Sequence, residues 1–441
     1  MSEYFHSVRL INERCKGCVS CIKRCPTEAI RIRAGKAHII ESRCIDCGEC
    51  IRRCPTHAKT AVTDQLSDLA NFSYNIALPA PALYAQFNID TSINSVLRGL
   101  LNLGFDDVYE VAQAAELVSI ATKEYLSNND VRRPVISSAC PAVVRLIQVK
   151  FPELIDNLLP INAPVEVAAR LVRKNCASAL NIRPQEIGVW FITPCPAKMT
   201  AVKQIIDTNS NISGAIGISK IYGDLIKAIP AGTKGKNLHK SSWKGIGWAV
   251  AGGESKAIDH QDVLVVYGIH SVSNALEQIV MGKLVGLDYV EALACSGGCI
   301  GGALTVENRF VAENRMKIRG QKMTSNKSDS PSSIASFKED LLRVDNSIEP
   351  KPVLLLDNDI TKAMSKVEEI EQTLKTLPGF DCGLCGSPNC YTLAQDMAQD
   401  MASETDCIFK LREKVRDLAR TMIELAEKLP PSLDKDSSEK D

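Results

Sequence analysis

Three features are missing from this sequence of 441 residues, and each absence argues against a class of protein. No apolar run approaches the roughly 18 residues that a membrane-spanning helix needs. The net charge is zero, so no basic field would attract nucleic acid or anionic lipid. The first residues, "MSEYFHSVRLINER", lack the basic-then-apolar pattern of a signal peptide. We therefore expect a cytoplasmic protein with neither a nucleic-acid nor a membrane partner.

Histidine is scarce, whereas cysteine is abundant. The 6 histidines all lie outside the tight cysteine motifs, and cysteine occurs 17 times. In a reducing cytosol this number indicates metal sites or redox chemistry rather than disulfides. Ligation by sulfur alone favours iron–sulfur clusters or zinc over harder metals. The length is enough for about two to four domains.

The first 65 residues contain one cysteine motif twice. The segments "CKGCVSCIKRCP" and "CIDCGECIRRCP" both have the spacing C-x2-C-x2-C-x3-C-P, the signature of a two-cluster bacterial ferredoxin. In this arrangement the fourth cysteine of each motif binds the cluster of the other. A zinc ribbon would need two C-x2-C pairs instead. We predict one 4Fe-4S cluster on Cys15, Cys18, Cys21 and Cys54, and another on Cys25, Cys44, Cys47 and Cys50.

Basic and alternating residues accompany these motifs. Lys23, Arg24, Arg52 and Arg53 lie beside the cysteines. They either offset the negative clusters, meet an acidic electron carrier or form an ordinary solvated face. Between the motifs, "AIRIRAGKAHIIES" alternates as a β-hairpin does, around Gly35.

Residues 66–319 alternate short apolar segments with amphipathic ones. "NIALPAPAL", "RPVISSACP" and "IGVWFITPCP" have the pattern of buried strands, and "SINSVLRGLLNLG" and "VEVAARLVRKN" that of helices. This alternation predicts an α/β domain with parallel strands, whose ligand sites lie at the carboxyl ends of the strands.

Four cysteines of this domain lie on three distant loops. Cys140 and Cys195 each follow a predicted strand and precede a proline. "ALACSGGCIGGAL" adds Cys295 and Cys299, among glycines that let the backbone approach a bulky cofactor. Together they would supply the four thiolates of one cubane. Single buried cysteines without a metal are the alternative.

The same loops resemble those of a known family. "SSACP", "TPCPAK" and "EALACSGGCIGGA" are similar to the three signature loops of FeFe-hydrogenases, in that family's order, and "WAVAGGESKAI" is similar to one of its glycine segments. The resemblance implies that the four cysteines bind a 4Fe-4S cubane. It implies that Cys299 also bridges to a di-iron subsite with carbonyl, cyanide and azadithiolate ligands. Lys198 would hydrogen-bond one cyanide, and Ala80 and Pro81 would lie near the other; an exposed Lys198 is the alternative.

The sequence departs from the family's ordinary enzymes around that subsite. Ala139 replaces a second cysteine that relays protons, and a methyl group cannot carry a proton. Thr193 and Leu293 replace methionines of the pocket, and Ala163 replaces a serine of the usual proton path.

Further along that path, Thr122 and Tyr125 occupy positions of glutamates, while Glu116 and Glu124 lie nearby and leave room for a different route. The combination resembles a sensory subgroup of the family with alanine at this position and an additional C-terminal 4Fe-4S domain. The resemblance implies slow, reversible dihydrogen chemistry used for signalling.

The end of the chain holds the last cysteine set. Residues 320–350 are polar and serine-rich, which predicts a flexible linker. Residues 408–429 are amphipathic and predict a helix that packs on its own domain or on another chain. We expect a disordered tail at 431–441 and a filler role for Cys176. The spacing C-x2-C-x4-C-x16-C resembles a small 4Fe-4S domain of anaerobic redox proteins, with zinc as the alternative, on Cys382, Cys385, Cys390 and Cys407.

Together these features predict a multidomain protein of the α+β and α/β classes. It comprises a two-cluster ferredoxin domain (1–65), a two-lobed FeFe-hydrogenase-like domain (66–319), the linker and a mostly helical 4Fe-4S domain (351–430). The predicted function is slow dihydrogen oxidation and proton reduction for sensing. Electrons would pass through the clusters to a carrier such as ferredoxin, and the signal would pass to another protein. The alternative is a non-catalytic electron-transfer or assembly protein without the di-iron subsite; a homodimer is one expected assembly.

Overall fold

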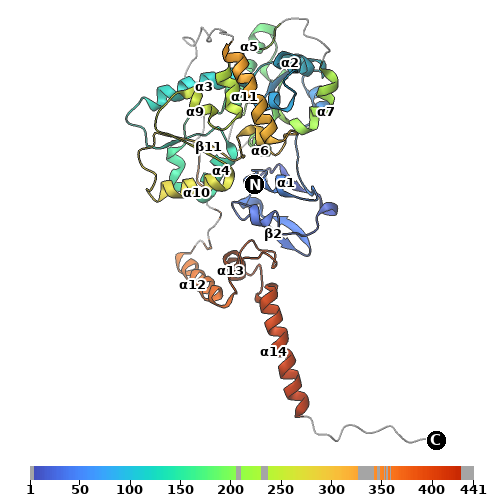
Figure 1. The fold of residues 1–441 in the computed structure, drawn as a ribbon, viewed down its shortest axis with the longest axis vertical. Coiled ribbons are helices and arrows are strands. Elements are labelled where there is room, and N and C mark those ends of the chain that lie inside the picture. The colour runs from blue at the N-terminus through green and yellow to red at the C-terminus, as the bar shows by residue number, and fades with distance from the viewer. Residues whose placement is uncertain are drawn as a thin grey trace, which may run out of the picture. The chain divides into compact units, whose positions relative to one another are not determined.

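A computed structural model describes residues 4–204, 210–229, 237–325, 342–344, 348–351, 353, 356–357 and 359–428. The chain forms two compact units (Figure 1). The first contains the described residues of 1–15, 24–29 and 39–354, and the second those of 16–23, 30–38 and 355–441. The segment predicted as a ferredoxin domain is therefore shared between the two units.

Two parallel sheets form the lobes of the first unit. One has the strand order β6-β5-β8-β9 and the other β10-β11-β7, and every pairing in both is parallel, as predicted. All seven residues of β8 are buried, which explains its unbroken apolar sequence. The strands are β5 (Tyr74–Pro79), β6 (Asp107–Val108), β7 (Val135–Ile136), β8 (Ile187–Thr193), β9 (Gly214–Gly217), β10 (Val263–Tyr267) and β11 (Tyr289–Leu293).

Helices follow the strands, so each strand end leads into a helix start. Proline occupies the first turn of α4, α5 and α6, where its missing N–H costs no hydrogen bond. The helices are α2 (Ile93–Asn102), α3 (Val111–Leu126), α4 (Pro141–Lys150), α5 (Pro164–Leu180), α6 (Pro196–Lys203), α7 (Ile218–Ala228), α8 (Trp243–Ile246), α9 (Gly253–Ile258), α10 (Ile269–Val280) and α11 (Arg309–Ser325). The linker predicted from residue 320 thus begins inside α11.

The N-terminal part of the first unit is small. β1 (Val8–Leu10) pairs antiparallel with β4 (Lys59–Ala61). The short helix α1 (Glu49–Arg53) contains the predicted ligand Cys50 and its basic neighbours Arg52 and Arg53. Most of the predicted linker, residues 326–341 and 345–347, lies outside the described residues. The described residues 342–344 of this segment are attached to the first unit, because the Asn162 N–H donates to the carbonyl oxygen of Leu342 at 2.7 Å.

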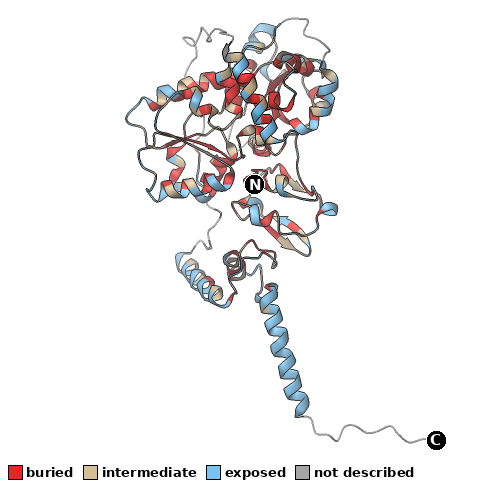
Figure 2. Ribbon diagram, in the orientation of Figure 1, coloured by how far each residue is buried: buried red, intermediate tan, exposed pale blue. Residues whose placement is uncertain are grey.

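The second unit combines the predicted hairpin with three helices. β2 (Ile30–Arg33) and β3 (Lys36–Ile39) flank Ala34 and Gly35, whose φ angles of 48° and 70° fit a tight two-residue hairpin turn. The helices are α12 (Ile360–Thr376), α13 (Cys390–Ala398) and α14 (Ile408–Glu427). α14 has no buried residue (Figure 2), and it contacts its own domain near its start, where the Phe409 ring lies 5.1 Å from that of Phe380. The predicted tail lies outside the described residues.

Among the described residues, no helix combines the length and the apolar character required to cross a bilayer.

Candidate metal centres

Three strand ends of the first unit bring four cysteines together. Cys140 follows β7 and begins α4, and Cys195 follows β8 and begins α6. Cys295 and Cys299 follow β11. These four thiols lie close enough to influence each other. Burial is the largest cause that raises the pKa of Cys140, Cys195 (to about 12) and Cys299, and neighbouring thiols of the set raise it further. Such a site holds protons until a cation replaces them, which is the behaviour of a metal site.

A cavity of about 110 Å³ adjoins the four cysteines. Its walls are mostly apolar and include the predicted residues Ala80, Pro81, Ala139, Lys198 and Leu293. Thr193, also predicted as a cofactor contact, does not line the cavity. Its hydroxyl instead accepts from the Cys195 N–H at 3.1 Å and lies 3.2 Å from the Cys195 carbonyl oxygen. The Thr193 hydroxyl therefore fixes the loop that carries the predicted ligand Cys195.

Lys198 is the cation of this cavity. It lies one turn along α6 from Cys195 and is partly buried, so the alternative of a freely exposed lysine does not hold. Burial lowers the pKa of Lys198, while the thiols of Cys140, Cys195 and Cys299 oppose that shift. An ammonium held here can donate hydrogen bonds to an anionic group beside the cysteines.

Gly298 explains part of the glycine-rich sequence around Cys299. Its φ is +93°, and a β-carbon there would lie 2.6 Å from the Ala251 nitrogen and 2.8 Å from the Ala249 oxygen. Only glycine permits both the backbone conformation and this close approach.

The second predicted ferredoxin set lies beside the central one, within the same unit. Cys25, Cys47 and Cys50 are mutual neighbours, and burial followed by these thiols raises the pKa of Cys47. Cys44 is partly buried beside Cys25 and Cys50. Cys47 also lines the cavity of the central set. The structure places Cys25 beside Cys44 and Cys47, and its assignment as the fourth ligand of this cluster stays a prediction.

Arg52 connects these two sets. Its Nη1 donates to the Cys295 Sγ and to the Gly301 carbonyl oxygen, both at 3.4 Å. Its Nη2 donates to Glu49 at 2.8 Å. Burial lowers the pKa of Arg52, but the negative charges of Cys295 and Glu49 outweigh it and raise the pKa above its usual value. Of the four basic residues that flank the motifs, Arg52 thus contacts a predicted ligand, whereas Arg53 is half exposed and pairs with Glu49.

Known protein families match separate parts of this chain. The family description "Iron only hydrogenase large subunit, C-terminal domain" matches residues 73–259 and 213–303, which together exceed half of the chain. The chain belongs to the iron-only hydrogenase large-subunit family. Two further descriptions match parts of this hydrogenase-family chain, "4Fe-4S dicluster domain" at residues 7–55 and "Putative Fe-S cluster" at 377–409. The chain is thus an iron–sulfur protein.

Its relatives include hydrogenases and an assembly factor. The chain is 26% identical over 362 residues to the periplasmic [Fe] hydrogenase large subunit of Nitratidesulfovibrio vulgaris, covering 67% of this chain and 86% of that protein. It is 22% identical over 286 residues to the NADP-reducing hydrogenase subunit HndD of Solidesulfovibrio fructosivorans, covering 52% of this chain and only 49% of that subunit. It is 20% identical over 273 residues to the Brugia malayi protein named "Probable cytosolic Fe-S cluster assembly factor Bm6838", covering 51% and 60%.

A buried acidic pair that the sequence interpretation missed lies beside the cavity of the central cysteine set. Glu254 lines the cavity and accepts from the Ser137 hydroxyl at 2.8 Å and from the Tyr289 hydroxyl at 2.5 Å. Glu291 accepts from Ser255 Oγ at 2.6 Å. Burial, then the neighbouring Glu291, raises the pKa of Glu254 to about 8, and burial also raises that of Glu291. Glu254 lies in "GGES" and Glu291 in "EALAC", where glycines and a cysteine dominate the pattern and a single glutamate gives no sign of burial.

The residues suggested for a different proton route lie elsewhere. Glu116 is buried on α3 and accepts from the Ser242 N–H at 2.6 Å, and Glu124 is exposed on the same helix. Thr122 is buried and donates to the Val118 carbonyl oxygen within its own helix, and none of the three lines the cavity. Cys176 is partly buried on α5 against an apolar core, as its filler role predicts.

The C-terminal cysteines form a separate group in the second unit. Burial, then the neighbouring Cys382 and Cys407, raises the pKa of Cys385. The Cys390 N–H donates to Asp381 at 2.7 Å, at the start of α13. Cys382 is exposed, unlike any cysteine of the central set. Cys18 and Cys21 belong to this unit, while Cys15 and Cys54 belong to the first, so the cluster assigned to these four stays a prediction.

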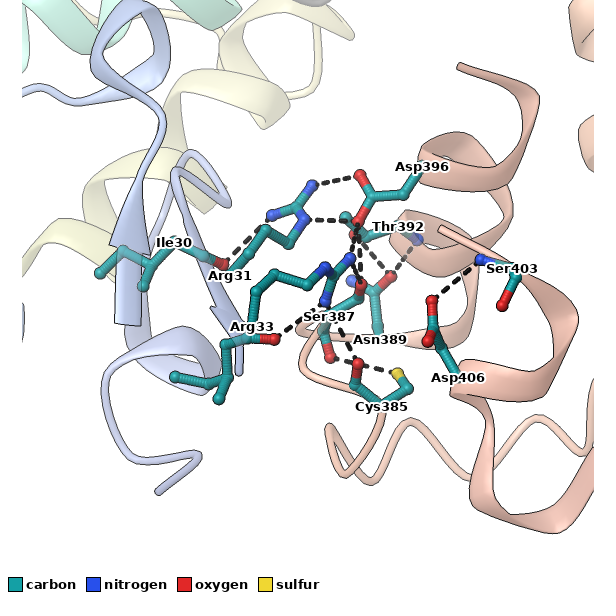
Figure 3. A network of polar contacts seen from close by, with 11 residues as sticks. Ile30, Arg31, Arg33, Cys385, Ser387, Asn389, Thr392, Asp396, Ser403 and Asp406 are labelled. Carbon is teal, nitrogen blue, oxygen red and sulfur yellow. Dashed lines mark hydrogen bonds and ion pairs between the residues drawn. The ribbon is translucent and has the colours of Figure 1, made fainter. Parts of the chain in front are cut away.

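The C-terminal group is fixed to the hairpin by a buried ion pair (Figure 3). Arg31, 5% exposed, donates through Nε and Nη2 to both oxygens of Asp396, 1% exposed, at 2.5 and 2.8 Å. Arg33 and Ser387 also donate to Asp396, at 3.3 and 2.9 Å. The Ile32 N–H donates to the Gly386 carbonyl oxygen at 2.8 Å. The loop between Cys385 and Cys390 is therefore held against the ferredoxin hairpin.

Proposed function

We propose that this chain is a low-turnover FeFe-hydrogenase-type enzyme that oxidises dihydrogen and reduces protons reversibly, and that it serves as a sensor of dihydrogen or redox state. The observation that carries the proposal is the convergence of Cys140, Cys195, Cys295 and Cys299 on a cavity that also holds Lys198. A cubane alone needs four thiolates. A cavity with a cation beside Cys299 offers space and a hydrogen-bond donor for a second, anionic group.

The residues present fit a 4Fe-4S cubane joined to a di-iron subsite. Soft thiolates are suited to iron–sulfur ligation, and Cys299 would hold both parts. When bound, the di-iron subsite supplies the metal centre at which dihydrogen is split or formed. Lys198 would donate a hydrogen bond to an anionic ligand of that subsite. Ala80, Pro81 and Leu293 exclude water, which strengthens this charge interaction.

Proton transfer would use Glu254 instead of the usual cysteine. Ala139 has no titratable group, whereas Glu254 lines the same cavity and is hydrogen-bonded to Ser137 and Tyr289. A carboxyl group with a raised pKa can both release and accept a proton near neutral pH. Glu254 would therefore hold the proton nearest to the cavity and pass it through hydroxyl groups.

Electron transfer would begin at the set Cys25, Cys44, Cys47 and Cys50, because Cys47 lines the cavity and the Arg52 guanidinium, which donates to Cys295, also interacts electrostatically with Cys47. The remaining clusters would pass electrons to a carrier such as ferredoxin. The sensing role is supported by Ala139, since loss of the ordinary relay residue limits turnover more than it limits binding of dihydrogen. The sequence holds no motif of a kinase, phosphatase or DNA-binding protein that we can find, so a downstream protein would receive the signal.

The second candidate is a non-catalytic iron–sulfur protein without the di-iron subsite, a class favoured by the similarity to a protein named as an assembly factor. The test is infrared spectroscopy of the full chain after anaerobic maturation by the hydrogenase-specific machinery, together with dihydrogen turnover. We expect carbonyl and cyanide bands that shift when Lys198 is replaced by alanine. Fully loaded 4Fe-4S clusters without such bands would reject the proposal and leave the second candidate.

A further inference from the structure

The ion pair of Arg52 and Glu49 lies beside the central cysteine set and near the neighbouring set of Cys25, Cys44, Cys47 and Cys50. The Arg52 Nη1 donates to the Cys295 Sγ at 3.4 Å, and its Nε and Nη2 donate to the Glu49 carboxylate at 3.2 and 2.8 Å. The side chain of Arg52 is 22% exposed and that of Glu49 11%. Charges in such surroundings act strongly on a neighbouring metal centre, because little water screens them.

The start of α1 packs tightly against the loop that follows the central cysteines. A β-carbon at Gly48, which precedes the helix, would lie 2.5 Å from the Ala303 Cβ, so only glycine permits this approach. Arg52 also donates to the carbonyl oxygen of Gly301 at 3.4 Å, in the same loop. The packing of the helix and this hydrogen bond together fix the guanidinium beside Cys295.

The charge of Arg52 acts unequally on the two cysteine sets. A guanidinium is positively charged at any pH at which the protein is folded, and a reduced cluster carries one more negative charge than an oxidised cluster. Positive charge and hydrogen bonds to the ligand sulfurs therefore favour the reduced cluster and raise its reduction potential. Arg52 contacts Cys295 directly but interacts with Cys47 only through its charge, so its effect is larger on the central set.

We infer that Arg52 raises the reduction potential of the central cubane relative to that of the neighbouring cluster, and that Glu49 limits this rise. The inference rests on the cluster assignments of the proposed function, but it does not need the di-iron subsite. One electron leaves the neighbouring cluster, which is oxidised, and enters the central cubane, which is reduced; no bond is broken and no proton moves. Arg52 is a positioning residue, since it acts through the ligand Cys295. It retains the electron beside the cavity.

The test is a potentiometric titration of the full chain with its 4Fe-4S clusters loaded, followed by electron paramagnetic resonance. The central signal is the one that disappears in Cys140→Ala, and the neighbouring signal is the one that disappears in Cys47→Ala. Arg52→Gln removes the positive charge and should shift the electron equilibrium away from the central cubane about tenfold, which corresponds to about 59 mV for a one-electron couple. Glu49→Gln removes the counter-charge and should shift the equilibrium toward the central cubane. Loosened packing alone would not give shifts of opposite sign.

The matched control is Arg53→Gln. Arg53 also pairs with Glu49, but its side chain is 54% exposed, so solvent screens its charge and both potentials should stay near those of wild type. If Arg52→Gln does not fold, Arg52→Gln/Glu49→Gln leaves neither charge of the pair without its partner, and its central potential should lie below that of Glu49→Gln. Shifts of the same sign in the two single variants, or shifts no larger than that of Arg53→Gln, overturn the inference alone. A wild type without a reducible cluster on the central set overturns the proposed function as well.

Discussion

The central and the C-terminal cysteine sets each offer four thiols, but they are built in different ways. The central ligands come from loops between residues 140 and 299 and meet only when two parallel sheets have placed three strand ends together. The C-terminal ligands lie between residues 382 and 407, with no sheet of their own, and one of them is exposed. The central set is thus a product of the whole fold and encloses a cavity, whereas the C-terminal set depends on a short segment and its contact with one hairpin.

The largest change in dihydrogen turnover is expected from a substitution in the central set alone. Cys299→Ser should reduce dihydrogen turnover to background, because Cys299 is the ligand assigned to both parts of the cofactor. The spectroscopic signals of the ferredoxin-type and C-terminal clusters should remain. Cys176→Ser, which alters a cysteine outside all four sets, is the matched control and should keep full turnover. Full activity in Cys299→Ser would contradict the bridging role.

The next effect tests how the central cavity handles protons. Glu254→Gln should lower turnover by about a hundred- to ten-thousand-fold, the usual contribution of a general acid–base group. The infrared bands should persist, since glutamine is similar in size and binds no metal here. Glu116→Gln changes a buried glutamate that does not line the cavity and should stay near wild type. Equal losses in both variants would assign Glu254 a merely structural role.

A third change acts only on the C-terminal set. Asp396→Asn leaves the buried guanidinium of Arg31 without its counter-charge, which typically costs about 3–5 kcal/mol. The Ile32 amide, which donates to Gly386, should then exchange hydrogen much faster, while turnover with an artificial electron donor stays constant. Asp400→Asn, an exposed aspartate on the same domain, should exchange as wild type does. Unchanged protection in Asp396→Asn would show that the ion pair does not hold the hairpin.

The pH dependence of stability provides a smaller effect. Burial and Glu291 raise the pKa of Glu254 to about 8, whereas an unfolded glutamate titrates at about 4.3. Between these values the folded state binds the extra proton, so its stability falls as pH rises, by at most about 1.4 kcal/mol per pH unit. Thermal unfolding of wild type and Glu254→Gln between pH 6 and 8 should therefore show the steeper decline in wild type. Parallel curves would contradict the buried, protonated state.

The smallest expected effect is a gain. Ala139→Cys restores a titratable group beside Cys140, and we expect at most about a tenfold increase in turnover, well below the full range of such groups. The rest of that path stays interrupted at Ala163, Thr122 and Tyr125. A combined variant with serine at 163 and glutamate at 122 and 125 should add more than the single changes do. If it is no faster while its infrared bands are intact, the altered residues Thr193 and Leu293 are the next cause to test.

Much of the architecture was predictable because it follows from local periodicity. The alternation of residues 29–42 predicted the β2–β3 hairpin, and the unbroken apolar run of β8 predicted a strand buried on both faces. The cysteine loops could be located because a proline after each strand marks a helix start. The pattern of α14 indicated an amphipathic helix, but amphipathicity alone does not tell which surface covers the apolar face.

What could not be predicted depends on pairs distant in sequence. Arg31 and Asp396 are far apart along the chain, and neither lies in a pattern that points to the other. Glu254 and Glu291 become a buried pair only when α9 packs beside β11. A charged residue in a sequence is usually exposed, so burial of these groups emerged from the structure alone.

The sharing of the N-terminal segment between the two units has a consequence for the order of folding. During synthesis the hairpin residues 30–38 leave the ribosome long before Asp396, so Arg31 must remain without its counter-charge while the parallel sheets form. Contacts of such sequence separation form late, because closing a long loop costs entropy before the contact repays it. The second unit is therefore completed last, and the docking of α13 on the hairpin marks a chain that has been synthesised at least through residue 398.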